Sequence, residues 1–397
     1  MEDIIIDSSK KVVCKSCNLY QTYVPDTLHP ELTPERVVRI NVHVIQDAKG
    51  KQNFSEDEGR LWVKQMVDNA NGRLSKNQKM NLPAGNTTAV LPVPYRYQIT
   101  GEPGSTGDDG IYFHRDDTLF SMNKKGKYNV YIPYQYEKYG IQKGHVINIF
   151  LIEHDPDSLK SHTYRATNDG IGTGPWAKIV GSYYLWKHPS GVNAQGDSIR
   201  FDFWNAAALL NHELGHCLGL SHTWNNNDGC DDTPLNPGCW NFGNPPCDHV
   251  SNNVMDYNAY QNSFTPCQLG KECYNFSKDG TQRNMLVQDW CHYDSSRTIT
   301  IKANDSVEWK KSIDLFGDLI LLRGSTLIMH CPVSMPPGSK IILQGKSKLI
   351  LDDCQLTSRC PDSRWSGIIF PKRKKNQPII ILKNGSTIEK AEHYSTQ

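Results

Sequence analysis

The sequence predicts an α+β fold, in which a twisted mixed β-sheet backed by two long helices precedes an all-β, repeat-like C-terminal module. Two long stretches, 55–74 and 201–220, place apolar residues at helical spacing. Several shorter stretches show the alternating or continuous apolar patterns of strands. Past about residue 295 the helical patterns end, and segments rich in Ile and Leu alternate with Gly-Ser turns. The chain therefore divides into a helix-and-sheet domain and a later β-rich one.

Four strands are expected in the first part of the chain, at 37–45, 95–100, 145–154 and 180–187. The third is almost continuously apolar, so we expect it to be buried on both faces of the sheet. The first long helix follows Ser55, and Glu58 stands three residues later, which is the pattern of a capping box. The second long helix is expected to bury one stripe made of Trp204, Ala208, Leu210, Leu214, Cys217 and Leu218.

The C-terminal part contains an internal repeat. LLRGSTLIM (321–329) is echoed by IILQGKSKLIL (341–351) and again by IIILKNGSTIE (379–389). A repeat of about 20 residues predicts a β-solenoid or a stacked β-sandwich. The last residues form no obvious polar cap, so we expect the native protein to continue beyond them. We thus predict three parts: a leader or pro-segment over 1–36, a helix-and-sheet domain over 37–295 and a β-rich module over 296–397.

The composition limits the partners and the compartment. The 43 basic and 42 acidic residues give a net charge of +1, which argues against nucleic acid or anionic membrane as a partner. No apolar run is long enough to span a membrane. Eight of the 12 cysteines lie between Cys217 and Cys331, in loops rich in Pro, Gly and Asn. This pattern is typical of disulfide-stapled exported proteins, with a reduced cytosolic protein as the alternative.

We therefore expect a secreted or cell-surface protein, of bacterial type. The first residues, MEDIIIDSSKK, have neither the basic start nor the apolar stretch of a signal peptide. We interpret Met1 as an added start that follows removal of a native signal. The composition says nothing about the oligomeric state.

The stretch HELGHCLGLSH contains the residues that indicate chemistry. His212 and His216 are four residues apart, so on a helix both imidazoles project from one face. Glu213 lies on an adjacent face, and a later glycine allows the chain to turn so that His222 can supply a third nitrogen. Three protein ligands with one position left for water form the catalytic Zn²⁺ arrangement. The alternatives are a helix with scattered histidines, or a structural zinc site closed by a nearby Cys or Asp.

This stretch resembles the zinc signature of the metzincin metallopeptidases, whose third histidine follows a glycine. Downstream, NNVMDYNAY (252–260) resembles their Met-turn, a tight loop that places a methionine beneath the metal. Met255 matches that methionine. Tyr257 matches a tyrosine that leans toward the metal in some metzincins.

Two further segments are similar to the pappalysin-type branch of that family, CDDTP (230–234) and FTPCQ (264–268). The resemblance covers about 37–290 and implies a metzincin-like domain with a twisted sheet and long helices. The C-terminal third is not covered, and it is similar to repeat modules appended to bacterial secreted proteins.

The resemblance implies a mechanism and a way of binding substrate. Glu213 would act as general base on a zinc-activated water, and the Tyr257 hydroxyl would help to stabilise the oxyanion. Met255 would support the site from below, and Tyr257 has a core aromatic role as its alternative. The strand expected at 180–187 stands where metzincins keep the edge strand that pairs with an extended peptide. An internal strand is the alternative for that segment.

The predicted function is a secreted zinc endopeptidase acting on protein or peptide substrates. One alternative is a cell-surface binding or adhesion protein that uses the β-module and carries a vestigial peptidase domain. The intact motif, including Glu213, argues against that alternative. A third possibility is a zinc hydrolase that acts on a non-peptide amide.

A second cation is expected directly after the third histidine. The segment NNNDGCDDTP (225–234) crowds Asp228, Asp231 and Asp232 together, with Thr233 adding a hydroxyl and a carbonyl. Carboxylates crowded in one loop repel each other unless a cation neutralises them, and all-oxygen ligands suit Ca²⁺. The resemblance to pappalysin-type peptidases also implies calcium beside the active site. A solvated acidic turn is the alternative.

The cysteines admit both structural and regulatory roles. Cys217 is expected to be a core thiol, because it points away from the metal-binding face. Disulfides are expected around the active-site loops, among Cys230, Cys239, Cys247, Cys267 and Cys273. A thiolate from Cys14 or Cys17 could occupy the fourth zinc position as a latency switch. Pairing of these two with each other or with a distant cysteine is the interpretation that we favour.

Overall fold

The computed structural model divides the chain into two compact units, each described here by itself. One unit is Glu35–Val287, and the other combines Met1–Pro34 with Gln288–Gln397. The structure describes residues 4–6, 15–122, 132–189, 191–192, 198–199, 201–223, 228–233, 250–257, 261–370 and 376–396. Among the helices so described, none is both long and apolar enough to cross a membrane.

A mixed β-sheet forms the centre of the first unit, as the sequence predicts. Its strands are β2 (Arg36–Gln46), β3 (Tyr95–Ile99), β4 (Ile111–Arg115), β5 (Ser121–Met122), β6 (Ile147–His154), β7 (Asp169–Thr173) and β8 (Trp176–Val180). They are ordered β3-β2-β6-β8-β7, with β4 also paired to β2 and β5 to β6. Every pair is parallel except β7 with β8, so β7 is an antiparallel edge strand. All eight residues of β6 are buried, which confirms the expectation for this strand.

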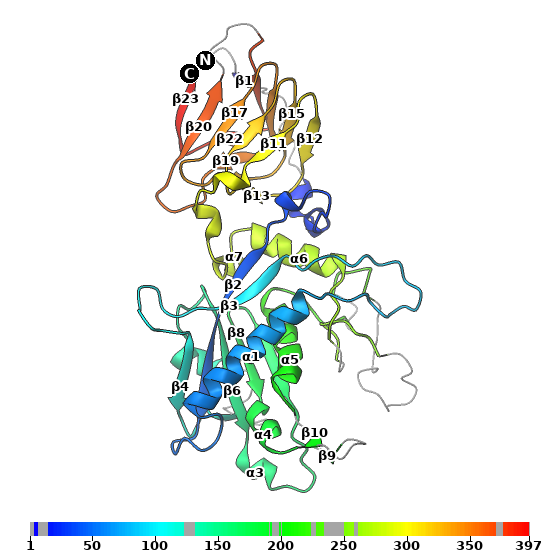
Figure 1. Cartoon of the computed structure of the whole chain (residues 1–397), viewed down its shortest axis with the longest axis vertical. Helices are drawn as coiled ribbons and strands as arrows, with labels where there is room; N and C mark the ends of the chain where they lie inside the picture. The colour runs from blue at the N-terminus through cyan, green and yellow to red at the C-terminus, as the bar shows by residue number, and fades with distance from the viewer. Residues whose placement is uncertain are drawn as a thin grey trace. The chain divides into compact units, whose positions relative to one another are not determined.

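Two long helices, α1 (Glu56–Leu74) and α5 (Phe203–Cys217), contact each other and the sheet (Figure 1). α1 packs on β3 and β4, whereas α5 packs on β7 and β8. The other helices of this unit are α2 (Tyr134–Tyr139), α3 (Pro156–Leu159), α4 (Ser182–Lys187), α6 (Pro266–Ser277) and α7 (Thr281–Asn284). A short hairpin joins β9 (Gly191–Val192) to β10 (Ser198–Ile199).

The prediction of a strand at 180–187 is wrong, because the chain forms helix α4 there. Gly181 takes a left-handed conformation with φ of 80° and ends β8. The buried Glu153 carboxylate then accepts hydrogen bonds from the amides of Tyr183 and Tyr184, which satisfies donors at the start of the helix. The edge of the sheet is β7 instead, a segment whose glycines gave no strand pattern.

The expected stripe of α5 is confirmed except at its first residue. Leu210, Leu214 and Cys217 are buried, but Trp204 is 48% exposed. The Arg73 guanidinium lies 4.0 Å from the Trp204 ring, a cation–π contact at the surface. The helical spacing predicted Trp204 on the inner face of α5, but the first turn of this helix lies beyond the edge of the core.

The second unit is a parallel β-solenoid, which decides between the two architectures that the repeat allowed. Its first sheet contains β11 (Ile299–Ile301), β14 (Leu319–Leu321), β17 (Lys340–Leu343), β20 (Trp365–Phe370) and β23 (Ala391–Thr396). Its second contains β12 (Ser306–Trp309), β15 (Thr326–Met329), β18 (Lys348–Asp352), β21 (Ile379–Lys383) and β1 (Ile4–Ile6). Its third contains β13 (Ile313–Asp314), β16 (Val333–Ser334), β19 (Gln355–Thr357) and β22 (Thr387–Ile388). Equivalent strands of successive turns pair in parallel, so each turn buries its apolar residues against the next.

The N-terminal segment belongs to the same compact unit as the solenoid. β1 pairs in parallel with β21, and the Tyr23 hydroxyl accepts a hydrogen bond from the Ser312 amide. A disulfide joins Cys17 to Cys331, so the Cys17 thiol is not available as a zinc ligand. Cys14 lies outside the described residues. The remaining short 3-10 helices of this unit are η1 (Lys15–Asn18), η2 (Tyr20–Tyr23), η3 (Pro30–Leu32), η4 (Asp289–Cys291) and η5 (Ser295–Arg297).

Candidate metal centre

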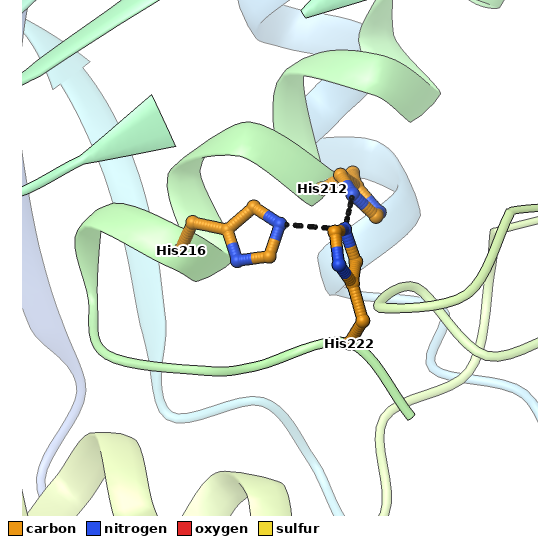
Figure 2. A group of neighbouring side chains, drawn as sticks. All are labelled: His212, His216 and His222. Carbon is orange, nitrogen blue, oxygen red and sulfur yellow. Dashed lines mark hydrogen bonds between the residues drawn. The ribbon is translucent and has the colours of Figure 1, made fainter. Parts of the chain in front are cut away.

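Helix α5 and the turn after it bring three histidines together. Asp202 caps the helix, since its side chain accepts hydrogen bonds from the amides of Trp204 and Asn205. Gly219 follows the helix with φ of 102°, a conformation that favours glycine, and the chain turns back. Figure 2 shows the result: His212 and His216 project from the helix and His222 meets them from the returning chain.

The facing nitrogens of the three rings converge. The Nε2 atom of His222 lies 3.1 Å from Nε2 of His212 and 3.0 Å from Nε2 of His216 (Figure 2). In the described part of the chain no fourth His, Cys, Asp or Glu belongs to this group. The arrangement therefore presents three nitrogens to one point and leaves further positions open.

The opposite nitrogens of two rings are held by backbone carbonyls. His212 Nδ1 lies 2.7 Å from the Val254 oxygen, and His216 Nδ1 lies 2.9 Å from the Leu220 oxygen. A carbonyl only accepts, so both Nδ1 atoms carry the proton and both Nε2 atoms present a lone pair. His222 has at most one Nε2 proton and cannot satisfy both lone pairs at once. A cation at the point where they meet removes the conflict.

Burial keeps the histidines unprotonated at neutral pH. Burial, together with the smaller effect of the neighbouring His216, lowers the pKa of His212 to about 3 and that of His222 to about 4. Burial also lowers the pKa of His216. Neutral imidazole is the form that binds metals.

Met255 lies against the helix, as the resemblance to a Met-turn implies. Its side chain is fully buried, and a Cβ atom on Gly215 would lie only 2.5 Å from its sulfur. The Met255 oxygen accepts a hydrogen bond from the Thr223 amide, directly after the third histidine. The glycine within the helix thus allows the close approach of the loop that carries Met255.

Glu213 is buried between α5 and the edge strand β7. Burial raises the pKa of its carboxyl to about 8, against a lowering by the Gly172 amide and with a smaller raising effect of Asp169. Glu213 thus directly follows His212 in the sequence, and its carboxyl group packs against β7.

Tyr257 lies beside the histidines and is 41% exposed. Its ring centroid is 4.8 Å from that of His222 and 5.8 Å from that of His212. This half-open position beside two of the three rings does not fit a purely core aromatic.

The four residues proposed for calcium do not come together as one carboxylate cluster. Asp228 accepts hydrogen bonds from the Cys230 amide and the Thr233 hydroxyl, and Asp231 is exposed. Asp232 accepts from the Cys267 amide at 3.0 Å. The Lys271 ammonium interacts electrostatically with Asp228 and Asp232, and so supplies part of the positive charge that the loop needs. Calcium binding stays a prediction.

The described cysteines have structural roles. Disulfides join Cys230 to Cys267 and Cys291 to Cys360. The first agrees with the expectation of disulfides around the active-site loops, for which the sequence indicates no specific pairing, and excludes these two sulfurs as thiolate ligands. Cys217 is a buried thiol, as expected. Cys239 and Cys247 lie outside the described residues.

Sequence reasoning missed the groups that orient the histidines. The Val254 and Leu220 carbonyls belong to the backbone, so no side-chain pattern could indicate them. Gln261 is buried, and its Nε2 atom donates to the Asp256 oxygen. The same atom lies 3.2 Å from His212 Nδ1, which already donates its proton to Val254, so Gln261 packs beside this ring without a hydrogen bond to it. A glutamine a few residues after Met255 was the only available signal for this contact.

Comparison with known proteins gives a limited result. No protein-family model matches the chain, and no curated protein matches it. Among solved structures, mature mirolysin of Tannerella forsythia in complex with a cleaved peptide aligns with a TM-score of 0.41 and 18% identity, over 63% of this chain and 95% of mirolysin. A Tannerella forsythia promirolysin mutant aligns with a TM-score of 0.38 and 16% identity, over 68% of this chain and 88% of its own. These values are too low to support a conclusion about chemistry, which depends on the site itself.

Proposed function

We propose that the chain is a secreted zinc metalloendopeptidase that hydrolyses peptide bonds of protein or peptide substrates. One observation carries the proposal: three histidine Nε2 atoms converge, and two of the rings are fixed with their lone pairs facing each other. Carbonyl groups that orient metal-binding histidines in this way are typical of metal sites. The three residues fit Zn²⁺, which takes imidazole nitrogens and, in catalytic sites, three protein ligands.

The chemistry follows from the residues around this point. His212, His216 and His222 would hold the zinc ion, which when bound would act as a Lewis acid and lower the pKa of a bound water toward 7. Glu213 follows the first histidine on the same rigid helix. The positive charge of a bound zinc ion would favour the ionised form of its carboxyl group, and the carboxylate could then accept a proton from water and deliver it to the leaving amine. Tyr257 lies half-exposed beside the His222 and His212 rings, and its hydroxyl could donate a hydrogen bond to a developing oxyanion.

Substrate binding is assigned to β7 in place of the segment 180–187. β7 is the last strand of the sheet and runs antiparallel to β8, so one row of its backbone groups lies outside the ladder. An extended peptide can pair with such an edge, and its side chains then alternate between pockets. α5 packs directly on β7, so a peptide bound there lies near the histidines.

The described disulfides support an extracellular location. Three are present, Cys17–Cys331, Cys230–Cys267 and Cys291–Cys360, and such bonds persist in oxidising compartments.

The test combines metal content with cleavage. We expect the purified protein to contain one equivalent of zinc and to cleave casein, with cleavage lost in a chelator. Glu213→Gln should retain zinc and lose activity by a factor of about 10²–10⁴, the usual contribution of general acid–base catalysis. Glu272→Gln, at a buried glutamate of the same unit outside the site, is the matched control and should remain active.

The outcomes also separate the alternatives. A protein that binds zinc but cleaves neither casein nor small amides would support the adhesion alternative. Cleavage of small non-peptide amides without cleavage of casein or peptides would support the amide hydrolase alternative.

A further inference from the structure

Two glycines of the edge strand β7 lie against the glutamate of the zinc motif. Gly170 pairs with Ile179 of β8, and Gly172 pairs with Ala177. Residues opposite each other in an antiparallel pair share a face of the sheet. Ile179 and Ala177 are fully buried, and α5 packs on both strands, so this face is the one that receives α5.

Neither position has room for a side chain. A Cβ atom on Gly170 would lie 2.3 Å from Oε1 of Glu213 and 2.6 Å from its Cδ. A Cβ atom on Gly172 would lie 1.9 Å from the backbone oxygen of Glu213. Neither glycine has a φ in the left-handed region, so glycine is required here for space and not for backbone conformation.

The same strand also places a backbone amide near the carboxyl group. The Gly172 amide favours the ionised form of Glu213. The position of Glu213 therefore depends on β7 in two ways: a strand amide lies near its oxygens, and the missing side chain of Gly170 leaves the volume that its carboxyl group occupies.

We propose that Gly170 and Gly172 are positioning residues for Glu213, which set the approach of α5 to β7 so that the carboxylate keeps its orientation toward the metal site. This inference rests on the proposed function, in which Glu213 is the general base. A misplacement of about 1 Å at a catalytic group can cost about 100-fold in rate, so the space at Gly170 is a catalytic requirement.

The test uses Gly170→Ala, because the atoms in its way belong to a flexible side chain and the fold can be retained. We expect stoichiometric zinc, an unchanged KM and a kcat lowered by about 100-fold. Gly172→Ala collides with the helix backbone and should lower both kcat and thermal stability. The matched control is Gly72→Ala in α1, where a Cβ meets nothing within 4 Å.

A second background separates positioning from general damage. Glu213→Asp shortens the side chain by one methylene, so its carboxyl group lies farther from Gly170. The methyl group that Gly170→Ala adds then has room. The penalty of Gly170→Ala on kcat should therefore shrink in the Glu213→Asp background. The proposal would be overturned if Gly170→Ala lowered kcat by the same factor in the wild type and in Glu213→Asp. It would also be overturned if Gly170→Ala lost zinc, or left kcat unchanged when Glu213 is present.

A metal-free measurement tests the contact without any activity. In amide hydrogen exchange of the apoprotein, Glu213→Ala removes the carboxyl group near the Gly172 amide, so exchange at Gly172 should become faster. Gly170→Ala should have the same effect, and Gly72→Ala none. Exchange at Gly172 unaffected by Gly170→Ala would overturn the positioning role. If the wild-type protein cleaved no peptide, the proposed function would fail while this measurement still decided the contact.

Discussion

Glu272 offers a quantitative test of the first unit, because it is a buried acid with a single hydrogen-bond partner among the described residues. It lies on α6 with no exposed surface, and Oε1 accepts a hydrogen bond of 2.9 Å from the Tyr95 hydroxyl. Its Oε2 atom is buried without a hydrogen-bond partner in the described part of the chain. Burial raises the pKa of Glu272 from 4.5 to about 8, against the smaller lowering by Tyr95.

The sign of the effect on stability follows from linkage. The folded state holds this proton more tightly than the unfolded state, so the contribution is fully present below pH 4.5 and is lost as pH rises through about 8. At about 1.36 kcal/mol per pH unit, the loss between pH 5 and pH 8 is about 3 to 4 kcal/mol. Glu272→Gln keeps an acceptor for Tyr95 and does not titrate, so it removes this part of the pH dependence.

The assay is urea unfolding of the metal-free wild type and of Glu272→Gln at pH 5 and pH 8. The difference in unfolding free energy between the two proteins should change by about 3 to 4 kcal/mol in favour of the variant at pH 8. Tyr95→Phe removes the hydrogen bond that lowers the folded-state pKa of Glu272, so its loss of stability should begin at the same pH as in the wild type and continue to a higher pH. Parallel loss of stability in wild type and Glu272→Gln would refute the reasoning.

Three further predictions concern the site. Met255→Ala should cost about 2–5 kcal/mol of stability, measured by denaturant unfolding, because it empties space beneath α5; an unchanged midpoint would contradict the packing. Replacing Cys230 and Cys267 by serine opens a loop spanning 37 residues. The change should lower the free energy of unfolding by about 2–4 kcal/mol and weaken zinc affinity if the loop orients His222. A free energy of unfolding equal to that of the wild type, in both oxidised and reduced buffers, would count against this. Calcium should raise the melting temperature by mass action, and a melting temperature equal in excess calcium and in a calcium-selective chelator, with zinc retained, would rule out a calcium site.

The strands and helices with strong periodicity were predictable from sequence. β2, β6 and α1 bury apolar residues at the expected spacing, so local pattern and tertiary packing agree. The edge strand β7 was missed because its DGIGT sequence carries glycines, whose role is to admit Glu213. α4 was misread as a strand because it depends on Gly181 and on the distant Glu153, which no local window contains.

The features of the site that depend on the spacing of side chains were predictable from the sequence. The features that depend on backbone groups were not. His212, His216 and His222 converge as the motif implies. Their orientation depends on the Val254 and Leu220 carbonyls, and any sequence supplies carbonyls. The N-terminal segment was also beyond local reasoning, since β1 and Cys17 join partners more than 300 residues away in sequence.

Zinc content measured together with peptidase activity, while zinc is removed and returned, tests the central claim most directly. The account predicts one equivalent of zinc, and cleavage of casein that falls and recovers in proportion to bound zinc. It also predicts that His212→Ala and His222→Ala lose both zinc and activity, whereas Glu213→Gln loses activity alone. Cleavage that survives complete removal of zinc, or full zinc binding after replacement of the histidines, would contradict it.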